Sequence, residues 1–303
     1  MNPSLPIFII AGPTAVGKSE LAVSVAERCG GEIVSADAFQ IYEGLDILTA
    51  KPAPELRARV PHHLIGEIPL EQSFDVAQFL RLAQERITAI RGRGRVPILV
   101  GGTGLYLRAL THGLADLPPA DASLRTQLET QTTADLSEQL AKLDPVSHAR
   151  IDLQNRRRVL RALEVCLLTD RPFSSLREEW ANPPIFADGL VLNRPREVLY
   201  ERINRRTAGM FDAGVIEEVS EAGSLGPTAS QTLGWREIQA VLRGEMSQDE
   251  CVALIQQTTR RYAKRQLTWF RREKHLEFVE LGSADPHAAL LDQWAHRATA
   301  TTI

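Results

Sequence analysis

The first part of the chain alternates strand-like runs with a segment of helical periodicity. The runs Ile7–Ala11, Glu32–Asp37 and Val96–Val100 are typical of buried strands. Between the last two, apolar residues from Phe74 to Ile90 follow helical spacing, which predicts a helix that ends at Gly92. Strands that alternate with helices predict an α/β fold with a parallel, doubly wound sheet, and functional residues then lie at the carboxyl ends of its strands.

The pattern changes between Asp116 and Pro184, where strand-like runs are absent. Prolines mark both ends of this stretch, at Leu117–Pro119 and at Asn182–Pro184. Apolar residues at helical spacing predict helices over Asp121 to Gln131, Asp135 to Leu143, Pro145 to Leu153 and Arg157 to Thr169. We therefore predict a helical insertion domain at 116–184.

The chain then returns to the earlier pattern. Gly189–Leu192 predicts another strand of the sheet, helices follow to about Lys274, and Phe278–Leu281 predicts a final short strand. We expect the tail from Thr299 to be frayed. Residues 1–115 and 185–303 together then form the sheet-containing core with its C-terminal helices.

The loop after the first predicted strand matches the phosphate-binding pattern G-x-x-x-x-G-K-[ST], and a helix is predicted to follow it at Glu20 to Arg28. This arrangement aims backbone N–H groups and the positive end of the helix at phosphate oxygens. Lys18 adds a mobile positive charge, and the hydroxyl of Ser19 is a ligand for Mg²⁺. The loop consists of Gly12, Pro13, Thr14, Ala15, Val16, Gly17, Lys18 and Ser19. We therefore predict a P-loop NTPase-like core that binds a di- or triphosphate.

Composition adds few constraints. Of the 303 residues, 44% are hydrophobic and 24% are charged, as in ordinary soluble globular proteins. No apolar run approaches the ~20 residues of a membrane helix, and the N-terminus lacks a signal-peptide pattern. The three cysteines, Cys29, Cys166 and Cys251, form no CxxC pair, which argues against a zinc site or a disulfide framework. We expect a cytoplasmic protein with no membrane partner.

The net charge of −3 taken alone argues against a nucleic-acid partner, but the basic residues are clustered. Phosphate binding depends on local clusters more than on the total charge of the chain. The alternative explanation is that these clusters are solvated helix faces. The clusters are Arg156, Arg157, Arg158 and Arg161; Arg202, Arg205 and Arg206; and seven basic residues between Arg260 and Lys274. Three clusters beside a phosphate loop favour a polyanionic partner.

Two further strand ends carry candidate chemistry. The second predicted strand ends at Asp37, and the third is followed by Gly101, Gly102 and Thr103. A nucleoside triphosphatase usually adds a second strand that ends on a carboxylate, and the third strand does not. Asp37 is therefore a candidate metal ligand or general base, while a turn or helix cap is the structural alternative.

At this point the ordered motifs resemble those of the tRNA dimethylallyltransferase family, also called tRNA isopentenyltransferases. The resemblance covers about residues 5–275. The motifs are GPTAVGKS, DAFQIY, Leu48–Pro52, His62–Ile65, GGTGLY, Arg161–Val165, Arg202–Met210, Leu233–Glu237 and Ala263–Phe270. Ala38 and Leu48 depart from the family pattern, which usually has Ser and Gly there, and Trp235 stands where Tyr is frequent.

The resemblance implies transfer of a dimethylallyl group from dimethylallyl diphosphate to the exocyclic amine of the adenosine 3′ to the anticodon, with release of pyrophosphate. It implies that Asp37 is the general base and that Thr103 contacts the reacting centre. Lys18, Arg206 and a Mg²⁺ ion held by Ser19 would neutralise the leaving group. The eight loop residues would bind the donor diphosphate.

The resemblance also implies which residues bind the anticodon stem-loop of tRNA. They are Asp37, Ala38, Phe39, Gln40, Arg125, Arg157, Arg158, Arg161, Trp235, Arg236, Lys264, Arg265, Gln266 and Trp269. Nothing in the sequence demands a dimer, and we expect a monomer. Two other functions stay open: prenyl transfer to a free adenine nucleotide, and a P-loop ATPase or small-molecule kinase.

Overall fold

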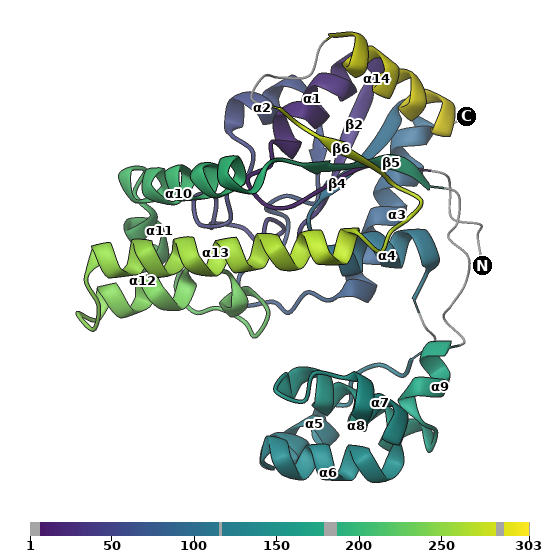
Figure 1. Cartoon of the computed structure of the whole chain (residues 1–303), viewed down its shortest axis with the longest axis vertical. Helices are drawn as coiled ribbons and strands as arrows, with labels where there is room; N and C mark the ends of the chain where they lie inside the picture. The colour runs from purple at the N-terminus through teal and green to yellow at the C-terminus, as the bar shows by residue number, and fades with distance from the viewer. Residues whose placement is uncertain (1–6, 115–116, 179–186, 283–287, 303) are drawn as a thin grey trace. The chain divides into compact units, whose positions relative to one another are not determined.

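The computed structural model of the chain describes residues 7–114, 117–178, 187–282 and 288–302 (Figure 1). The chain divides into two compact units. The first consists of Met1–Thr111 and Ile185–Ile303, and the second of His112–Pro184.

A parallel sheet forms the centre of the first unit. Its strand order is β3-β2-β4-β1-β5-β6, and all neighbouring strands run parallel. The strands are β1 (Ile7–Ala11), β2 (Gly31–Ala36), β3 (His62–His63), β4 (Val96–Gly101), β5 (Ala187–Asn193) and β6 (Glu277–Glu280). The α/β class and the parallel sheet predicted from the sequence are confirmed. The short strand β3 was not predicted, because two histidines give no apolar run.

The central strands β1, β2 and β4 of the sheet are buried on both faces. Side chains of a strand alternate between faces, so Ile7 and Ile9 of β1 point to one hydrophobic cluster and Phe8 and Ile10 to another. The sheet register places Ile9 beside Leu99 of β4, within the first cluster. Burial on both faces explains why these strands appear as continuous apolar runs in the sequence.

Helices from distant parts of the chain cover the two faces. Buried side chains of α1 and α14 pack in the cluster that contains Phe8, and those of α3 and α4 pack in the cluster that contains Ile9; α13 contributes to both. The helices of this unit are α1 (Lys18–Cys29), α2 (Pro54–Arg59), α3 (Val76–Gly92), α4 (Gly104–His112), α10 (Arg196–Asp212), α11 (Val215–Glu221), α12 (Trp235–Leu242), α13 (Gln248–Phe270) and α14 (Ala288–Thr302).

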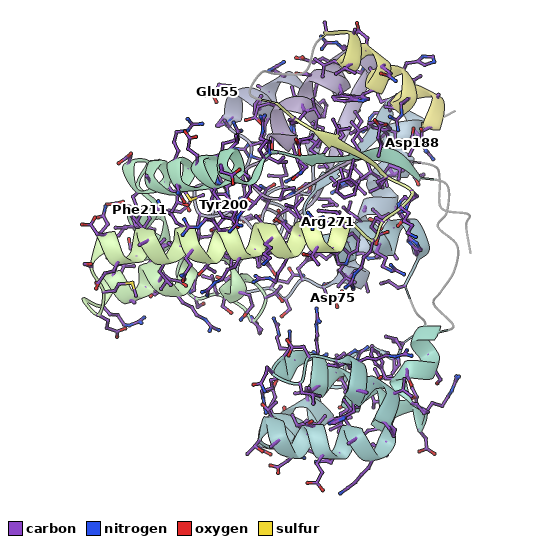
Figure 2. The ribbon with its side chains drawn as sticks, viewed as in Figure 1. Glu55, Asp75, Asp188, Tyr200, Phe211 and Arg271 are labelled. Carbon is purple, nitrogen blue, oxygen red and sulfur yellow. The ribbon has the colours of Figure 1, made fainter. Side chains whose placement is uncertain are left out.

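The expectation of a frayed tail from Thr299 was wrong. The chain remains helical through Thr302 in α14, and this helix packs against α1. Trp294 and Ala298 are buried, and Arg297 forms an ion pair with Asp188 of β5, which is labelled in Figure 2. Burial of a tryptophan and an ion pair to the sheet hold this end of the chain in place, although its composition gives no strong helix signal.

The second unit is a small helical bundle with its own core. Leu128, Leu136, Leu140 and Leu163 are buried together in it. Its helices are α5 (Ala122–Glu129), α6 (Thr133–Leu143), α7 (Pro145–Arg150), α8 (Arg156–Thr169) and α9 (Phe173–Glu178). The first four correspond to the predicted helices, and α9 was not predicted.

Candidate functional site: a phosphate loop facing a carboxylate

The phosphate loop lies between β1 and α1, and two glycines permit its shape. Gly12 and Gly17 have φ angles of 148° and 104°, in the region that side chains disfavour. A Cβ atom on Gly12 would also lie 2.6 Å from the carbonyl oxygen of Leu192 in β5. The loop therefore packs closely on the sheet, and α1 begins at Lys18 with its N-terminus directed at the loop.

Three arginines hold the outer side of the loop. Arg194 Nε donates to the carbonyl oxygen of Val16 at 2.9 Å, and Arg202 Nε donates to that of Ala15 at 2.8 Å. Arg206 Nη2 donates to the hydroxyl of Thr14 at 2.7 Å. We call Arg194, Arg202 and Arg206 the arginine clamp. Arg202 and Arg206 are therefore not a solvated helix face, and they add positive charge beside the loop.

The sequence predicted a role for Arg206 but missed Arg194. Arg194 follows β5 directly, and it is buried. A buried arginine at the carboxyl end of a strand is unusual, because arginine is rarely buried without a partner. Only the position of β5 beside β1 brings Arg194 to the loop, and no local pattern predicts that pairing.

Lys18 lies within the loop itself. Its Nζ atom donates to the carbonyl oxygens of Gly12 at 3.0 Å and Pro13 at 2.8 Å. Burial lowers the pKa of Lys18 to about 8; the negative charge of Asp37 opposes this shift, and the positive charge of Arg206 adds to it. Burial also lowers the pKa of Arg206. Both cations are thus partly desolvated, and both line the cavity, so an anion bound there would favour their charged forms.

Asp37 and Thr103 follow neighbouring strands, β2 and β4, at the same edge of the sheet. Asp37 Oδ1 accepts hydrogen bonds from the backbone N–H of Phe39 at 2.9 Å and of Gln40 at 3.2 Å. Thr103 Oγ1 accepts one from the backbone N–H of Ala38 at 3.1 Å. Oδ1 of Asp37 is fixed by its own turn, and no hydrogen bond to Oδ2 is present among the described residues.

Tyr262 of α13 is a further residue of the site that the sequence analysis missed. It lines the same cavity as Asp37. Burial raises the pKa of Tyr262, the charge of Asp37 raises it further, and hydrogen bonding to Thr103 and Gln266 acts in the opposite direction. The phenol is therefore neutral at physiological pH. The sequence offered one signal for Tyr262: it lies four residues before Gln266, which places both side chains on the same face of a helix.

A cavity of about 860 Å³ is lined by Lys18, Asp37, Arg206 and Tyr262, whereas Thr103 is not among its lining residues. Its lining also includes Thr14, Ala15, Gly17 and Ser19 of the phosphate loop, the segment Asp46–Pro54, and further residues of α10 and α13. Apolar side chains such as Leu48, Met210 and Ile255 contribute part of the wall. The cavity thus combines a cationic anion site, the carboxylates of Glu20, Asp37 and Asp46, and an apolar surface.

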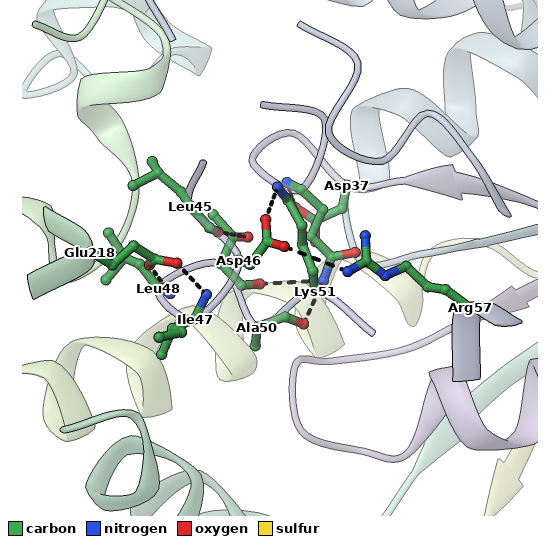
Figure 3. A network of polar contacts seen from close by, with 11 residues as sticks. Asp37, Leu45, Asp46, Ile47, Leu48, Ala50, Lys51, Arg57 and Glu218 are labelled. Carbon is green, nitrogen blue, oxygen red and sulfur yellow. Dashed lines mark hydrogen bonds and ion pairs between the residues drawn. The ribbon is translucent and has the colours of Figure 1, made fainter. Parts of the chain in front are cut away.

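The wall formed by residues 46–54 is tied down from several sides (Figure 3). Glu218 of α11 accepts hydrogen bonds from the backbone N–H groups of Ile47 at 2.7 Å and Leu48 at 2.8 Å. The buried Lys51 forms an ion pair with Asp46, and Arg57 lies 3.5 Å from the other oxygen of that carboxylate. Asp46 is therefore neutralised by two cations, and Glu20, which also lines the cavity, is exposed in the first turn of α1, so Asp37 is the better candidate base.

A family model described as IPP transferase matches residues 40–273. The chain belongs to the IPP transferase family. This confirms the resemblance found in the ordered motifs.

Curated relatives and solved structures agree with this assignment. This IPP transferase is 47% identical over 284 residues to the tRNA dimethylallyltransferase of Geobacter sulfurreducens, and the alignment covers 90% of this chain and 91% of the relative. It is 43% identical over 303 residues to the tRNA dimethylallyltransferase of Caulobacter sp., and the alignment covers 96% of this chain and 97% of the relative. The tRNA isopentenylpyrophosphate transferase of Bacillus halodurans superposes with a TM-score of 0.70 at 36% identity, covering 98% and 96%. A eukaryotic dimethylallyltransferase acting on tRNA superposes with a TM-score of 0.78 at 25% identity, covering 91% and 74%.

The expected tRNA-binding residues of this IPP transferase fall into several groups. Ala38, Phe39 and Gln40 follow Asp37 in the turn after β2. Arg236, Lys264 and Arg265 are exposed. Trp235 and Trp269 are half-buried against the core, so part of each ring packs in the protein and part is accessible. Gln266 differs from the rest because it is buried and bonded within the protein.

In the helical unit of this IPP transferase, the four expected arginines divide into two pairs. Arg157 and Arg158 are exposed at the start of α8. Arg125 and Arg161 both pair with Glu164, which is fully buried. Burial acts to raise the pKa of Glu164, but hydrogen bonds from the two arginines hold it below its usual range. Arg125 and Arg161 therefore have a structural role whether or not they also touch an RNA.

The described residues contain neither a cluster of metal-ligating side chains nor a helix able to span a membrane. Among these, no group of His, Cys, Asp and Glu side chains could by itself hold a metal ion. His63 lies 2.7 Å from Glu32, and His62 lies 2.8 Å from the carbonyl oxygen of Val60. Within the described part of this IPP transferase, no helix combines the length and the apolar character needed to cross a membrane.

Proposed function

We propose that this chain is a tRNA dimethylallyltransferase, which moves a dimethylallyl group from its diphosphate to the exocyclic amine of the adenosine 3′ to the anticodon. One observation carries the proposal beyond the family assignment. A cationic phosphate loop and Asp37 at the end of β2 line one cavity with an apolar wall, whereas the other lining carboxylates are Asp46, which is ion-paired, and Glu20, which is exposed. Such a cavity suits a donor with an anionic end and an apolar end, and an acceptor that must lose a proton.

The donor diphosphate binds in the loop from Gly12 to Ser19. Backbone N–H groups and the N-terminus of α1 face its oxygens, and Lys18 and Arg206 balance the charge that grows on the leaving pyrophosphate. Ser19 lines the cavity, and its hydroxyl would hold a Mg²⁺ ion there. Such an ion would supply further positive charge to the leaving group.

The acceptor amine attacks C1 of the donor from the side opposite the diphosphate. A C–N bond forms as the C–O bond breaks, pyrophosphate leaves, and the proton of the amine passes to Asp37. An adenine amine is a weak nucleophile, so a base that removes its proton during attack lowers the barrier. Thr103 contacts the reacting centre. The adenosine has to leave its base stack to reach this cavity.

The tRNA contacts are made by residues around Asp37, by the exposed basic residues of α12 and α13, and by the helical insertion. Arg157 and Arg158 contribute charge there, because they are exposed and have no acidic partner among the described residues. Phosphate contacts of this kind supply affinity without sequence selectivity. We further propose a monomer that acts in the cytoplasm.

Incubation with radiolabelled dimethylallyl diphosphate tests the proposal. Label should enter unmodified tRNA, but not AMP, and ATP should not be hydrolysed. Transfer to AMP alone would indicate a nucleotide prenyltransferase. ATP hydrolysis without transfer of label would indicate an ATPase or kinase. Either result would overturn the proposal.

A further inference from the structure

Gln266 of α13 is bonded at both ends of its amide to the two loops that carry the proposed chemistry. Its Oε1 accepts from the backbone N–H of Thr14 at 2.9 Å, and its Nε2 donates to the carbonyl oxygen of Gly102 at 2.9 Å. The residue is 6% exposed. Given the proposed transferase function, we propose that Gln266 is a positioning residue that sets the distance between the donor loop and the catalytic base, and not a residue that binds tRNA.

The amide completes a continuous series of hydrogen bonds across the site. On the donor side, Thr14 also accepts from Arg206 of the arginine clamp. On the base side, Gly102 precedes Thr103, whose hydroxyl accepts from the backbone N–H of Ala38, the neighbour of Asp37. A shift of the amide would therefore move the donor loop relative to Asp37. Networks of this kind are rigid only when every member is satisfied.

Glutamine is the side chain that these partners require. The backbone N–H of Thr14 needs an acceptor, and the carbonyl of Gly102 needs a donor; one primary amide supplies both, and a carboxylate does not. The fit is also close, because a Cβ atom on Gly102 would lie 2.3 Å from Gln266 Nε2. An apolar replacement would leave the buried carbonyl of Gly102 and the part-buried N–H of Thr14 without this partner.

The expected effect is on transfer and not on binding. Lys18, the arginine clamp and the exposed basic residues remain when Gln266 is changed, so donor and tRNA should still bind. The in-line geometry between amine, C1 of the donor and Asp37 would be lost. A misplacement of about 1 Å costs ~10²-fold in rate. Water then competes better for the donor, giving dimethylallyl alcohol and pyrophosphate while its proton passes to solvent.

The test compares Gln266→Met with Gln256→Met. Gln256 lies on the same helix, and its Nε2 donates to the carbonyl oxygen of Asn204 at 3.2 Å, so this control also removes an amide hydrogen bond. Four quantities are measured for each: the single-turnover transfer rate, the Kd of an unreactive thiolo analogue of the donor, the Kd of tRNA, and the ratio of donor hydrolysis to transfer.

For Gln266→Met we expect a transfer rate lower by ~10–100-fold, both Kd values within about threefold of wild type, and a higher ratio of hydrolysis to transfer. Gln256→Met should resemble wild type. A higher Kd for tRNA, together with a normal transfer rate at saturating tRNA, would restore the tRNA-binding assignment of Gln266 and overturn the inference. A weaker Kd for the donor analogue with a normal rate would also overturn it.

Gln266→Glu keeps the inference testable if the methionine variant does not fold. A carboxylate repels the carbonyl of Gly102, but a protonated carboxyl group accepts and donates as the amide does. The transfer rate of this variant, divided by that of wild type at each pH, should therefore rise as the pH falls. A ratio that does not change with pH would refute the positioning role. If wild type itself fails to transfer label to tRNA, the proposed function fails instead.

Discussion

Replacing Asp37 by asparagine tests the proposed mechanism most directly. The asparagine side chain would keep an oxygen that accepts from the backbone N–H groups of Phe39 and Gln40, so the turn should persist. It would not accept a proton from the adenosine amine. Loss of a general base costs ~10²–10⁴ in rate. At 1.36 kcal/mol per tenfold, this is about 2.7–5.4 kcal/mol of transition-state free energy.

The same substitution also weakens local bonds, and a matched control separates that effect. Asp75, labelled in Figure 2, accepts from the backbone N–H groups of Ala77 and Gln78 in the same pattern, but it caps α3 and does not line the cavity. Replacing a charged acceptor by a neutral one costs about 1 kcal/mol of folding stability at either position. Asp75→Asn should therefore lower the melting temperature by a similar amount and leave the transfer rate unchanged.

The assay is single-turnover transfer of labelled dimethylallyl to tRNA with enzyme in excess. We expect Asp37→Asn to lose at least ~10²-fold in rate, with tRNA affinity changed by less than ~1.4 kcal/mol, or tenfold. Near-normal chemistry in this variant would remove Asp37 as the base and refute the mechanism. Recovery of the rate at high Mg²⁺ would instead make Asp37 a metal ligand.

Three further results are expected. Because burial lowers the pKa of Lys18 to about 8, this side chain loses its charge as the pH rises through that value; kcat/KM for the donor should fall above about pH 8, and Lys18→Arg should remove this decline. Replacing both Arg157 and Arg158 by alanine should reduce the slope of log Kd for tRNA against log salt by about 0.7–0.9 per lost phosphate contact, with donor binding unchanged; an unaltered slope would mean a solvated face. Trp294→Ala should lower the free energy of unfolding by ~3–5 kcal/mol in urea titrations, and a loss below about 1 kcal/mol would show that α14 contributes little.

Local patterns were sufficient for much of the fold and for part of the site. The apolar runs of β1 and β4 are visible because both faces of the sheet are covered, and the glycine pattern of the phosphate loop lies in consecutive residues. Asp37 and Thr103 follow predicted strands, so the rule for parallel sheets placed them at one edge. Their hydrogen-bonded link through Ala38 agrees with that placement.

What the sequence did not predict depends on contacts between distant segments. Gln266 and Thr14 are 252 positions apart, so no local pattern predicts the hydrogen bond between them. Arg194 reaches the loop only because β5 pairs with β1. The helix α14 has a weak periodicity, and its stability comes from Trp294 packing in the cluster that contains Phe8. No window of neighbouring residues contains this information.

The position of β1 in the sheet has a consequence for the order in which the chain is made. β1 lies between β4 and β5, and β5 follows the whole helical unit in sequence. Until Ala187–Asn193 has been synthesised, the apolar strand β1 presents one edge of free N–H and C=O groups to solvent. Such edges recruit strands from other chains. A fragment that stops before β5 should therefore aggregate even though it contains the entire phosphate loop, and a soluble minimal version of the core must retain β5.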